Sequence, residues 1–429
     1  MSRRMTRLAR RRSPSLGAAA RRHVVIIIEN LPLRLDRRVR NECRALVDAG
    51  YRVSVICPKE HPGEPDRHEL DGTTVHSYTA PEGGTGGAAG YFWEFGVCLA
   101  RTAQLSLRIH RDAPFDVLQA CNPPDTFWPL GALWKLRGRA FVFDQHDLCP
   151  EVYEARFGSR GALHRGLLWL ERQTYRVADR VISPNPAYQE IALERGRIRA
   201  EHSAVVMSTP DATVMKRGPS HGELRGEFEH LVCYVGIMGP QDGVDSLLAW
   251  IDAYVHGLGR ADTRFALLGF GDSLEDLRAE STRRGLDRWV QFTGRVDHEE
   301  LGRWLSTADL GVTPDPQNEF NHRSTMNKTL EYMAHELPTV ATDLRETRRC
   351  AQDAAVYVSG GDAVEAARSI AQLLDDPERR ATMGRIGRER IESELAWELQ
   401  AQAYAKVFDE LTGAVPQGAA ARGRLTREP

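Results

Sequence analysis

Short apolar runs alternate with amphipathic helical patterns along nearly the whole chain. In the first half, the runs that predict buried strands are residues 24–28, 52–56, 75–78, 117–120, 141–143 and 180–183. In the second half they are residues 231–235, 265–268, 290–293, 310–313, 339–341 and 355–358. This alternation is typical of βαβ units around a parallel sheet. We therefore predict an α/β fold with two Rossmann-like, doubly wound domains that face each other across a ligand-binding cleft.

The alternation lapses once, in a polar segment that contains glycine and proline. We take that segment as a connector and the last helical pattern, which no strand follows, as a helix that crosses back to the first domain. The expected divisions are an N-terminal domain over 23–205, a connector over 206–228, a C-terminal domain over 229–395, a C-terminal helix over 396–411 and a loose tail over 412–429. Residues 1–22 hold eight arginines and no acidic residue, so we expect a disordered arm. Anionic lipid is a candidate partner for this arm, and a solvated tail without a function is the alternative.

Composition narrows the class of protein. The chain has 429 residues, 41% of them hydrophobic and 27% charged, which is typical of a soluble globular protein. Its longest aliphatic run is far shorter than the roughly 20 residues of a membrane-spanning helix, and no signal-peptide pattern is present. The seven cysteines are scattered without a CxxC pair, so we expect reduced thiols in a cytoplasmic protein that has no metal site. The part after the arm is acidic overall, which argues against nucleic acid as a partner.

The segment from Arg323 to Glu346 carries the most chemistry. Ser324 is placed to cap a helix, and Lys328 and Glu331 are three residues apart on one face of it. A cation beside a carboxylate suits a ligand with one charged end and one hydroxylated end. An ordinary i,i+3 ion pair on a surface helix is the alternative interpretation.

A second basic segment follows the first predicted strand. Asp36 is placed to cap a helix, and arginines crowd its start, among them Arg37 and Arg38. Cations are unfavourable at the positive end of a helix, so we predict that an anion such as phosphate binds there, close to Asn30. No GxGxxG motif follows this strand, which argues against a nicotinamide-dependent enzyme.

Polar residues also follow two further strands of the first half. Asp144, His146 and Asp147 come after one of them, and a neutral imidazole there is able to accept a hydroxyl proton or to hydrogen-bond a sugar. Asn122 and Asp125 follow the preceding strand and are weaker candidates for the same rim. A structural role is the alternative for each of these residues.

Several stretches together resemble one enzyme family. They are ENLPLRLDRRVRNE, DQHDLCPE, YVGIMGPQDGVD, FTGRV, STMNKTLEYM and ELPTVATDL. The chain resembles the nucleotide-sugar glycosyltransferases of family 4, which have the two-domain GT-B fold, in a bacterial branch that assembles surface polysaccharides and other glycoconjugates. The resemblance implies transfer of a sugar, typically a hexose, from a nucleoside diphosphate donor with retention and without a metal or cofactor. It leaves the acceptor open among a glycan, a lipid-linked molecule and a small molecule.

The resemblance also implies residue roles. Glu331 corresponds to the carboxylate that binds the ribose hydroxyls, and His146 to the histidine beside the transferred sugar; with Lys328 they are the expected catalytic residues. The loop that holds the diphosphate and faces the sugar corresponds to Ser324, Thr325, Met326 and Asn327. The remaining donor contacts are expected from Gly236, Gly239, Arg295 and Val296.

Some positions depart from the family pattern. Arg323 stands where an acidic residue is common, and Ile237 and Asp242 stand where an arginine and a lysine usually hold the diphosphate. Each lost charged hydrogen bond is worth about 1.5–3 kcal/mol. We therefore expect Lys328, Arg323, Arg37 and Arg38 to supply the missing positive charge. Glu336 replaces a usual glycine, at a cost of about 1 kcal/mol if its backbone is left-handed.

Two other functions share this architecture. A non-hydrolysing nucleotide-sugar epimerase needs acid–base carboxylates in the cleft, for which Asp144, Asp147 and Glu151 are the candidates. A non-catalytic partner of a true transferase is compatible with the lost cations. A peripheral membrane contact is suggested by Tyr91, Phe92, Trp93 and Phe95, which precede Arg101, Arg108 and Arg111 on a helical pattern that is equally able to pack inward.

Overall fold

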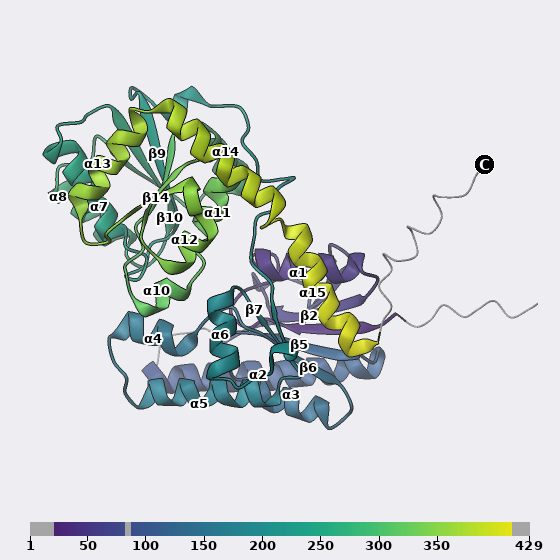
Figure 1. Cartoon of the computed structure of the whole chain (residues 1–429). Helices are drawn as coiled ribbons and strands as arrows, with labels where there is room; N and C mark the ends of the chain where they lie inside the picture. The colour runs from purple at the N-terminus through teal and green to yellow at the C-terminus, as the bar shows by residue number, and fades with distance from the viewer. Residues whose placement is uncertain (1–20, 82–86, 414–429) are drawn as a thin grey trace, which may run out of the picture.

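The computed structural model describes residues 21–81 and 87–413, which form two α/β domains joined by a connector (Figure 1). The strands of the first domain are β1 (His23–Ile27), β2 (Arg52–Pro58), β3 (Arg67–Leu70), β4 (Thr73–Tyr78), β5 (Val117–Cys121), β6 (Ala140–Asp144), β7 (Arg180–Ser183) and β8 (Ser203–Val205). They form one sheet in the order β3-β4-β2-β1-β5-β6-β7-β8. Only β3 runs antiparallel to its neighbour within this sheet.

Helices cover both faces of this first sheet. They are α1 (Arg37–Asp48), α2 (Gly87–Asp112), α3 (Trp128–Lys135), α4 (Cys149–Phe157), α5 (Ala162–Val177) and α6 (Pro186–Glu194). Alternate residues of β1 point to opposite faces, so Val24 and Ile26 pack with α1, while Val25 and Ile27 pack with α2 and α3. As predicted, Asp36 caps α1, because its side chain accepts a hydrogen bond from the Val39 amide.

The second domain has a six-stranded, fully parallel sheet in the order β11-β10-β9-β12-β13-β14. Its strands are β9 (His230–Ile237), β10 (Thr263–Phe270), β11 (Val290–Gly294), β12 (Leu310–Thr313), β13 (Thr339–Thr342) and β14 (Ala355–Val358). Its helices are α7 (Val244–Asp252), α8 (Leu274–Arg283), α9 (His298–Thr307), α10 (Glu319–Arg323), α11 (Asn327–Ala334), α12 (Arg345–Ala351), α13 (Ala363–Leu374) and α14 (Pro377–Ser393). The buried clusters on the two sides of this sheet form the second core.

The last helix, α15 (Trp397–Thr412), crosses back to the first domain, as predicted (Figure 1). Its Tyr404, Val407 and Phe408 are buried against α1 and the first sheet. The Tyr404 hydroxyl donates to Gln119 Oε1 at 2.6 Å, and the Tyr51 hydroxyl donates to Asp409 Oδ1 at 2.7 Å. The chain therefore links the two domains twice, through the connector and through this helix.

The twelve predicted strands all exist, and the structure adds β3 and β8. The strand β3 lies at the edge of the sheet. Its sequence, RHEL, is polar, so it lacks the apolar run that marks a buried strand. The strand β8 has only three residues. Glu336 does adopt a left-handed backbone, with φ of 56°, which is the condition under which its side chain costs stability.

All seven cysteines are free, and all except Cys149 are buried, as expected for reduced thiols. Within residues 21–81 and 87–413, no helix has both the length and the apolar character needed to cross a bilayer. The predicted arm and tail lie almost wholly outside the described residues. The side chains of Tyr91 and Phe92 lie outside them as well.

Candidate active site between the two domains

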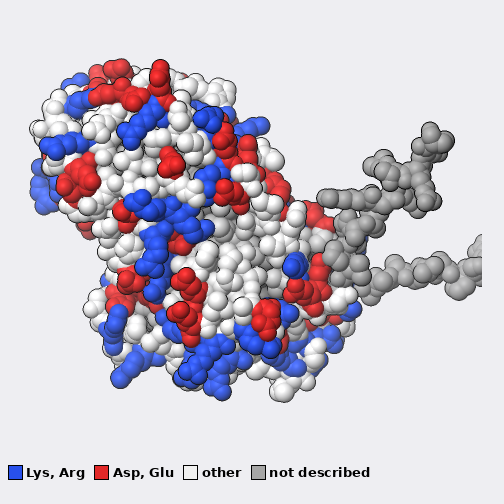
Figure 2. Space-filling model, viewed as in Figure 1, with Lys and Arg blue, Asp and Glu red and all other residues white. Residues whose placement is uncertain are grey.

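A cavity of about 480 Å³ lies between the domains, and we call it the interdomain cavity. Its walls are segments that follow β1, β6 and β7 in the first domain, and β9 and β12 in the second, so they come from the carboxyl ends of parallel strands. The predicted site residues that line it are Asn30, Arg37, Arg38, His146, Ser324, Thr325, Met326 and Asn327. Figure 2 shows basic side chains gathered where the second domain, above, meets the first.

The helix that carries Lys328 and Glu331 begins later than predicted. It starts at Asn327 after Met326, and no side chain caps it, so the prediction that Ser324 caps this helix is wrong. Ser324 instead ends the short helix α10, which Asn318 caps, and its hydroxyl donates to the Phe320 carbonyl at 2.9 Å. The stretch from Ser324 to Met326 is therefore an extended loop whose residues line the interdomain cavity.

Lys328 and Glu331 each have a partner elsewhere, so they are not the surface i,i+3 pair that the sequence left open. Lys328 Nζ lies 2.8 Å from Asp315 Oδ1 and 5.0 Å from the centre of the Tyr234 ring. Glu331 Oε1 lies 2.7 Å from Arg37 Nη1, which belongs to the other domain. The carboxylate expected to bind ribose is thus held by an arginine that lines the interdomain cavity.

Besides Lys328, two more of the four predicted phosphate-binding cations are engaged with carboxylates. Arg38 is buried, with Nε 2.9 Å from Glu42 Oε1 and Nη2 2.8 Å from Asp144 Oδ1, so its charge is already balanced. Arg323 pairs with Glu319 at 3.3 Å and does not line the interdomain cavity. The i,i+4 partners Glu42 and Glu319 were overlooked in the sequence, which could not reveal Asp144, because that residue comes from a distant part of the chain.

A carboxylate, Asp242, stands where the family pattern has a lysine, and a second carboxylate, Asp315, lies on the same cavity wall. Asp242 lines the interdomain cavity, and burial raises the pKa of its carboxyl group although Lys328 opposes the shift. Its Oδ2 accepts a hydrogen bond of 2.9 Å from the Gly239 amide. Asp315, buried and paired with Lys328, lines the same wall. Arg37 is therefore the half-exposed cation that the described cavity lining offers to an anion.

Arg295 and Val296, which the family resemblance places at the nucleobase of the donor, do not line the interdomain cavity. The Arg295 guanidinium lies 5.1 Å from the centre of the Phe270 ring, and both side chains are exposed. Exposed Ile237 ends the neighbouring strand, in register with Phe270. A Cβ on Gly236 would come within 3.2 Å of Lys328 Cε, so the absence of a side chain there makes room for the lysine. Phe270 and Ile237 were missed, although each is an apolar residue at a strand's carboxyl end.

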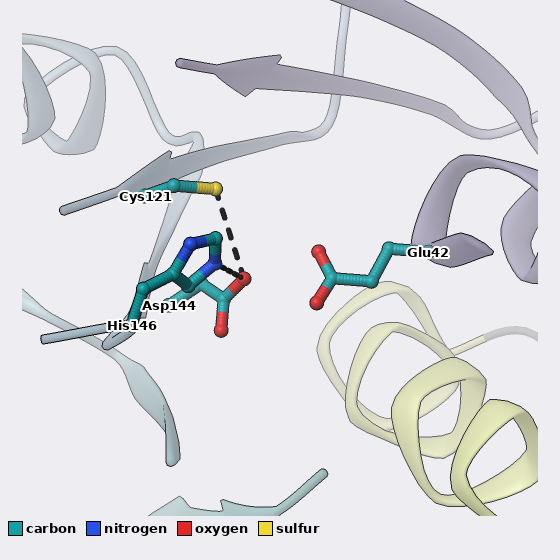
Figure 3. Close-up of side chains that lie close together, drawn as sticks. All are labelled: Glu42, Cys121, Asp144 and His146. Carbon is teal, nitrogen blue, oxygen red and sulfur yellow. Dashed lines mark hydrogen bonds and ion pairs between the residues drawn. The ribbon is translucent and has the colours of Figure 1, made fainter. Parts of the chain in front are cut away.

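His146 lies at the interdomain cavity with one ring nitrogen bound. Its Nε2 is 2.7 Å from Asp144 Oδ2 (Figure 3), and its backbone amide donates to Asn122 Oδ1 at 2.6 Å. Although burial pushes the pKa of Asp144 upward, Arg38 and His146 outweigh it and hold that pKa below its usual range. In the neutral tautomer whose Nε2–H donates to an ionised Asp144, Nδ1 carries a lone pair.

Asn122 and Asp125 are buried and do not line the interdomain cavity, so their predicted place on its rim is wrong. Asn122 Nδ2 donates to Asp125 Oδ1 at 3.2 Å and to the Asp147 carbonyl at 2.8 Å. Both residues therefore hold the loop that carries His146. They are polar because a buried turn has backbone groups to satisfy.

Asn185 and Tyr188 were missed and connect the domains at the interdomain cavity. Asn185 Nδ2 donates to the Arg323 carbonyl at 2.8 Å and to Thr325 Oγ1 at 3.0 Å. The Tyr188 hydroxyl lies 3.2 Å from Ser324 Oγ. Asn185 follows β7 at its carboxyl end, the same signal that had identified His146 after β6.

Two family models match the chain. A glycosyl transferase 4-like domain matches residues 35–208, and glycosyl transferases group 1 matches residues 229–376. A GDP-mannose-dependent monoacylated alpha-(1-6)-phosphatidylinositol monomannoside mannosyltransferase of Corynebacterium glutamicum is 27% identical over 176 residues, which are 39% of this chain and 44% of that protein. The chain spans about half the length of the curated relatives that it matches first.

Solved structures share the whole fold. Sucrose-phosphate synthase from Thermosynechococcus elongatus superposes with a TM-score of 0.72 at 20% identity, covering 92% of this chain and 100% of that one. The HepE protein of Anabaena, in complex with UDP-glucose, superposes with a TM-score of 0.68 at 17% identity, covering 90% and 99%. With both domains matched in sequence and both sheets matched in structure, the chain belongs to the GT-B glycosyltransferases, with a glycosyl transferase 4-like domain followed by a group 1 domain.

Proposed function

We propose that this protein transfers a sugar, typically a hexose, from a nucleoside diphosphate donor to an acceptor hydroxyl with retention at the anomeric carbon. The observation that carries the proposal is the interdomain cavity, where His146 of one domain faces the loop from Ser324 to Asn327 of the other. A site shared by two domains lets closure exclude water from a reactive donor. The donor named for the mannosyltransferase relative is GDP-mannose, and the HepE complex contains UDP-glucose, so the nucleobase stays open.

The donor fits the site in one orientation. Its ribose hydroxyls bind Glu331 and displace Arg37, which then moves to the diphosphate. The amides of the loop from Ser324 to Asn327 face the same phosphates, and Lys328 adds positive charge beside Gly236. Charge gathers on the diphosphate as the glycosidic bond breaks, so groups fixed there stabilise the transition state most. Ile237, Phe270 and Arg295 offer a flat apolar face to the base.

The acceptor enters from the first domain. His146, with Nδ1 unprotonated, binds a hydroxyl of the transferred sugar or of the acceptor. For retention, the acceptor attacks from the side that the diphosphate leaves, and a phosphate oxygen takes its proton. The residues of this chain bind, orient and exclude water, and no metal or cofactor is required by this scheme.

The geometry supports a transferase over the epimerase alternative. Of the three carboxylates that the epimerase would need, Asp144 is held by Arg38 and Glu151 by Arg195 at 2.5 Å. Asp147 lines the interdomain cavity, and burial raises its pKa. A single carboxyl group does not provide an acid and a base on opposite faces of a sugar.

A thermal-shift screen tests donor binding. We expect the matching nucleoside diphosphate and its sugar to raise the melting temperature, because a ligand at 100 times its Kd stabilises the native state by about 2.7 kcal/mol. The melting temperature of the wild-type protein is measured with each common nucleoside diphosphate and with the matching monophosphate as a control. If no diphosphate raised it, the non-catalytic alternative would stand instead.

We also propose that the first domain contacts an anionic membrane through α5 and its neighbours. Arg165, Trp169, Arg172 and Arg176 share one exposed stripe of α5, and the acid of that helix, Glu171, is buried against Arg195. Exposed Trp93, Leu107, Leu133 and Leu136 come from α2, α3 and the turn after α3. These helices form the lower face of the molecule in Figure 1, where Figure 2 shows basic side chains.

Vesicle sedimentation measures this contact. We expect binding to vesicles that contain phosphatidylglycerol and none to pure phosphatidylcholine, because each basic residue near an anionic surface contributes about 1 kcal/mol. Replacing Arg165, Arg172 and Arg176 together with glutamate should weaken binding at least 100-fold. The matched control replaces three exposed arginines of the second domain, Arg278, Arg288 and Arg385. Equal losses in both triple variants would refute this surface.

A further inference from the structure

Four side chains meet beneath the wall of the interdomain cavity (Figure 3). They are Glu42 of α1, Cys121 at the end of β5, Asp144 at the end of β6 and His146, and one polar atom of each lies within 4.8 Å of the others. Glu42 and Asp144 are fully buried, and in Figure 3 the Glu42 carboxyl group points toward Asp144. Arg38 pairs with both carboxyl groups and supplies one positive charge to the two of them.

A chain of hydrogen bonds joins this cluster to the C-terminal helix. Gln119 Nε2 donates to Glu42 Oε2 and to Asp144 Oδ2, both at 3.1 Å. Gln119 Oε1 accepts the Tyr404 hydroxyl of α15 at 2.6 Å. The helix that crosses back between the domains thus fixes the groups behind His146.

The charges of the cluster do not balance if every acid is ionised. Two buried carboxylates face one guanidinium, and an unbalanced buried charge is expensive. Burial raises the pKa of Glu42 well above its usual range, and the nearby Asp144 raises it further, against the attraction of Arg38. The other titratable groups around Glu42 are Asp36, Cys43, Cys121 and Tyr404, and burial raises the pKa of each of the last three.

We propose that Glu42 is a positioning residue that carries a proton at neutral pH and thereby keeps Asp144 ionised as the acceptor of the His146 Nε2–H. A proton on Asp144 instead would turn that oxygen into a donor and favour the other imidazole tautomer. Glu42 then acts through Asp144 on the tautomer that His146 presents to the interdomain cavity. The expected effect of Glu42 on catalysis rests on the proposed function. The proton on Glu42 and the tautomer of His146 are properties of the protein before substrate binds.

The proton is tested without any assay of transfer. We expect the infrared difference spectrum of wild type minus Glu42→Gln at pH 7 to show the C=O band of a protonated carboxyl group. The nitrogen chemical shifts of His146 are assigned by comparison with His146→Gln. They should report the Nε2–H tautomer in the wild type and in Glu42→Gln. An ionised carboxylate in the difference spectrum, or an Nδ1–H tautomer in the wild type, would overturn the proposal.

Transfer kinetics test the positioning role. Glu42→Gln is neutral and of the same shape, and its amide oxygen still accepts one of the two contacts that Arg38 and Gln119 make with Glu42, so we expect kcat within about threefold of wild type. Glu42→Met has a similar volume without polar atoms, and we expect it to lose the single tautomer and at least tenfold in kcat. A folded Glu42→Met protein that keeps the single tautomer and the wild-type kcat would refute the role. If Glu42→Met does not fold, a tenfold loss of kcat in Glu42→Gln would refute the positioning role equally. Absence of transfer in the wild type would count against the proposed function alone.

Discussion

Replacing Glu331 with alanine should lower kcat/KM for the donor by at least 100-fold. The carboxylate accepts hydrogen bonds from two ribose hydroxyls in our account, and each charged hydrogen bond contributes about 1.5–3 kcal/mol. Because about 1.4 kcal/mol corresponds to a factor of ten, losing both gives an effect of this size. Initial rates at several donor concentrations measure it.

The matched control for Glu331 is Glu319→Ala. Glu319 lies in the same segment, on α10, but it is exposed and pairs with Arg323. We expect this control to stay within about twofold of wild type. The melting temperature of both variants must also be measured, because Glu331 is buried and its loss frees Arg37. A Glu331→Ala protein that is folded and retains donor kinetics would contradict the assignment of this residue.

Replacing His146 with alanine should lower kcat about 100-fold while donor affinity changes little. In the proposed mechanism the imidazole, oriented by Asp144, holds a hydroxyl at the reacting centre, and misplacing a reacting group by about 1 Å costs about 100-fold in rate. Single-turnover rates separate the chemical step from donor binding. His61→Ala is the control, since His61 is an exposed histidine of the same domain. An unchanged single-turnover rate in His146→Ala would contradict a role at the reacting sugar.

The ion pair between Arg37 and Glu331 affects how the donor binds. It joins the two domains, with Arg37 Nη1 2.7 Å from Glu331 Oε1. A donor whose ribose takes Glu331 must break that pair, and it releases a cation where the diphosphate arrives. Arg37 exchanges one counter-charge for another, and Glu331 exchanges the guanidinium for two hydroxyl donors, so neither group is left without a hydrogen-bonding partner.

The periodicity of the sequence was enough to predict the architecture. Parallel strands buried on both faces give continuous apolar runs, so β1 or β13 could be recognised without any tertiary information. The cap at Asp36 depends only on a local side chain, and the return of α15 follows from a helix with no strand after it. The edge strand β3 could not be predicted, because its residues are polar and its pairing is its only support.

The site was predictable only in part, because partners across the chain decide which charges are free. Arg38 and Arg37 are neighbours with the same side chain and both line the interdomain cavity, yet Arg38 is buried between Glu42 and Asp144 while Arg37 is half-exposed. Ser324 fits the composition of a cap, but the chain forms a separate short helix before it. Position at the carboxyl end of a strand identified His146 and also marks Asn185 and Phe270, which were overlooked, but the same signal misplaced Asn122 and Asp125.

Sugar transfer with retention is tested most directly by following the fate of the donor in the presence and absence of an acceptor. The sugar nucleotide that raises the melting temperature is incubated with the wild-type protein, and NMR records the anomeric signals over time. We predict release of nucleoside diphosphate together with a new glycoside of the same anomeric configuration, only when acceptor is present and not with Glu331→Ala. Conversion of the donor into an epimer without acceptor, or a glycoside of inverted configuration, would contradict the account.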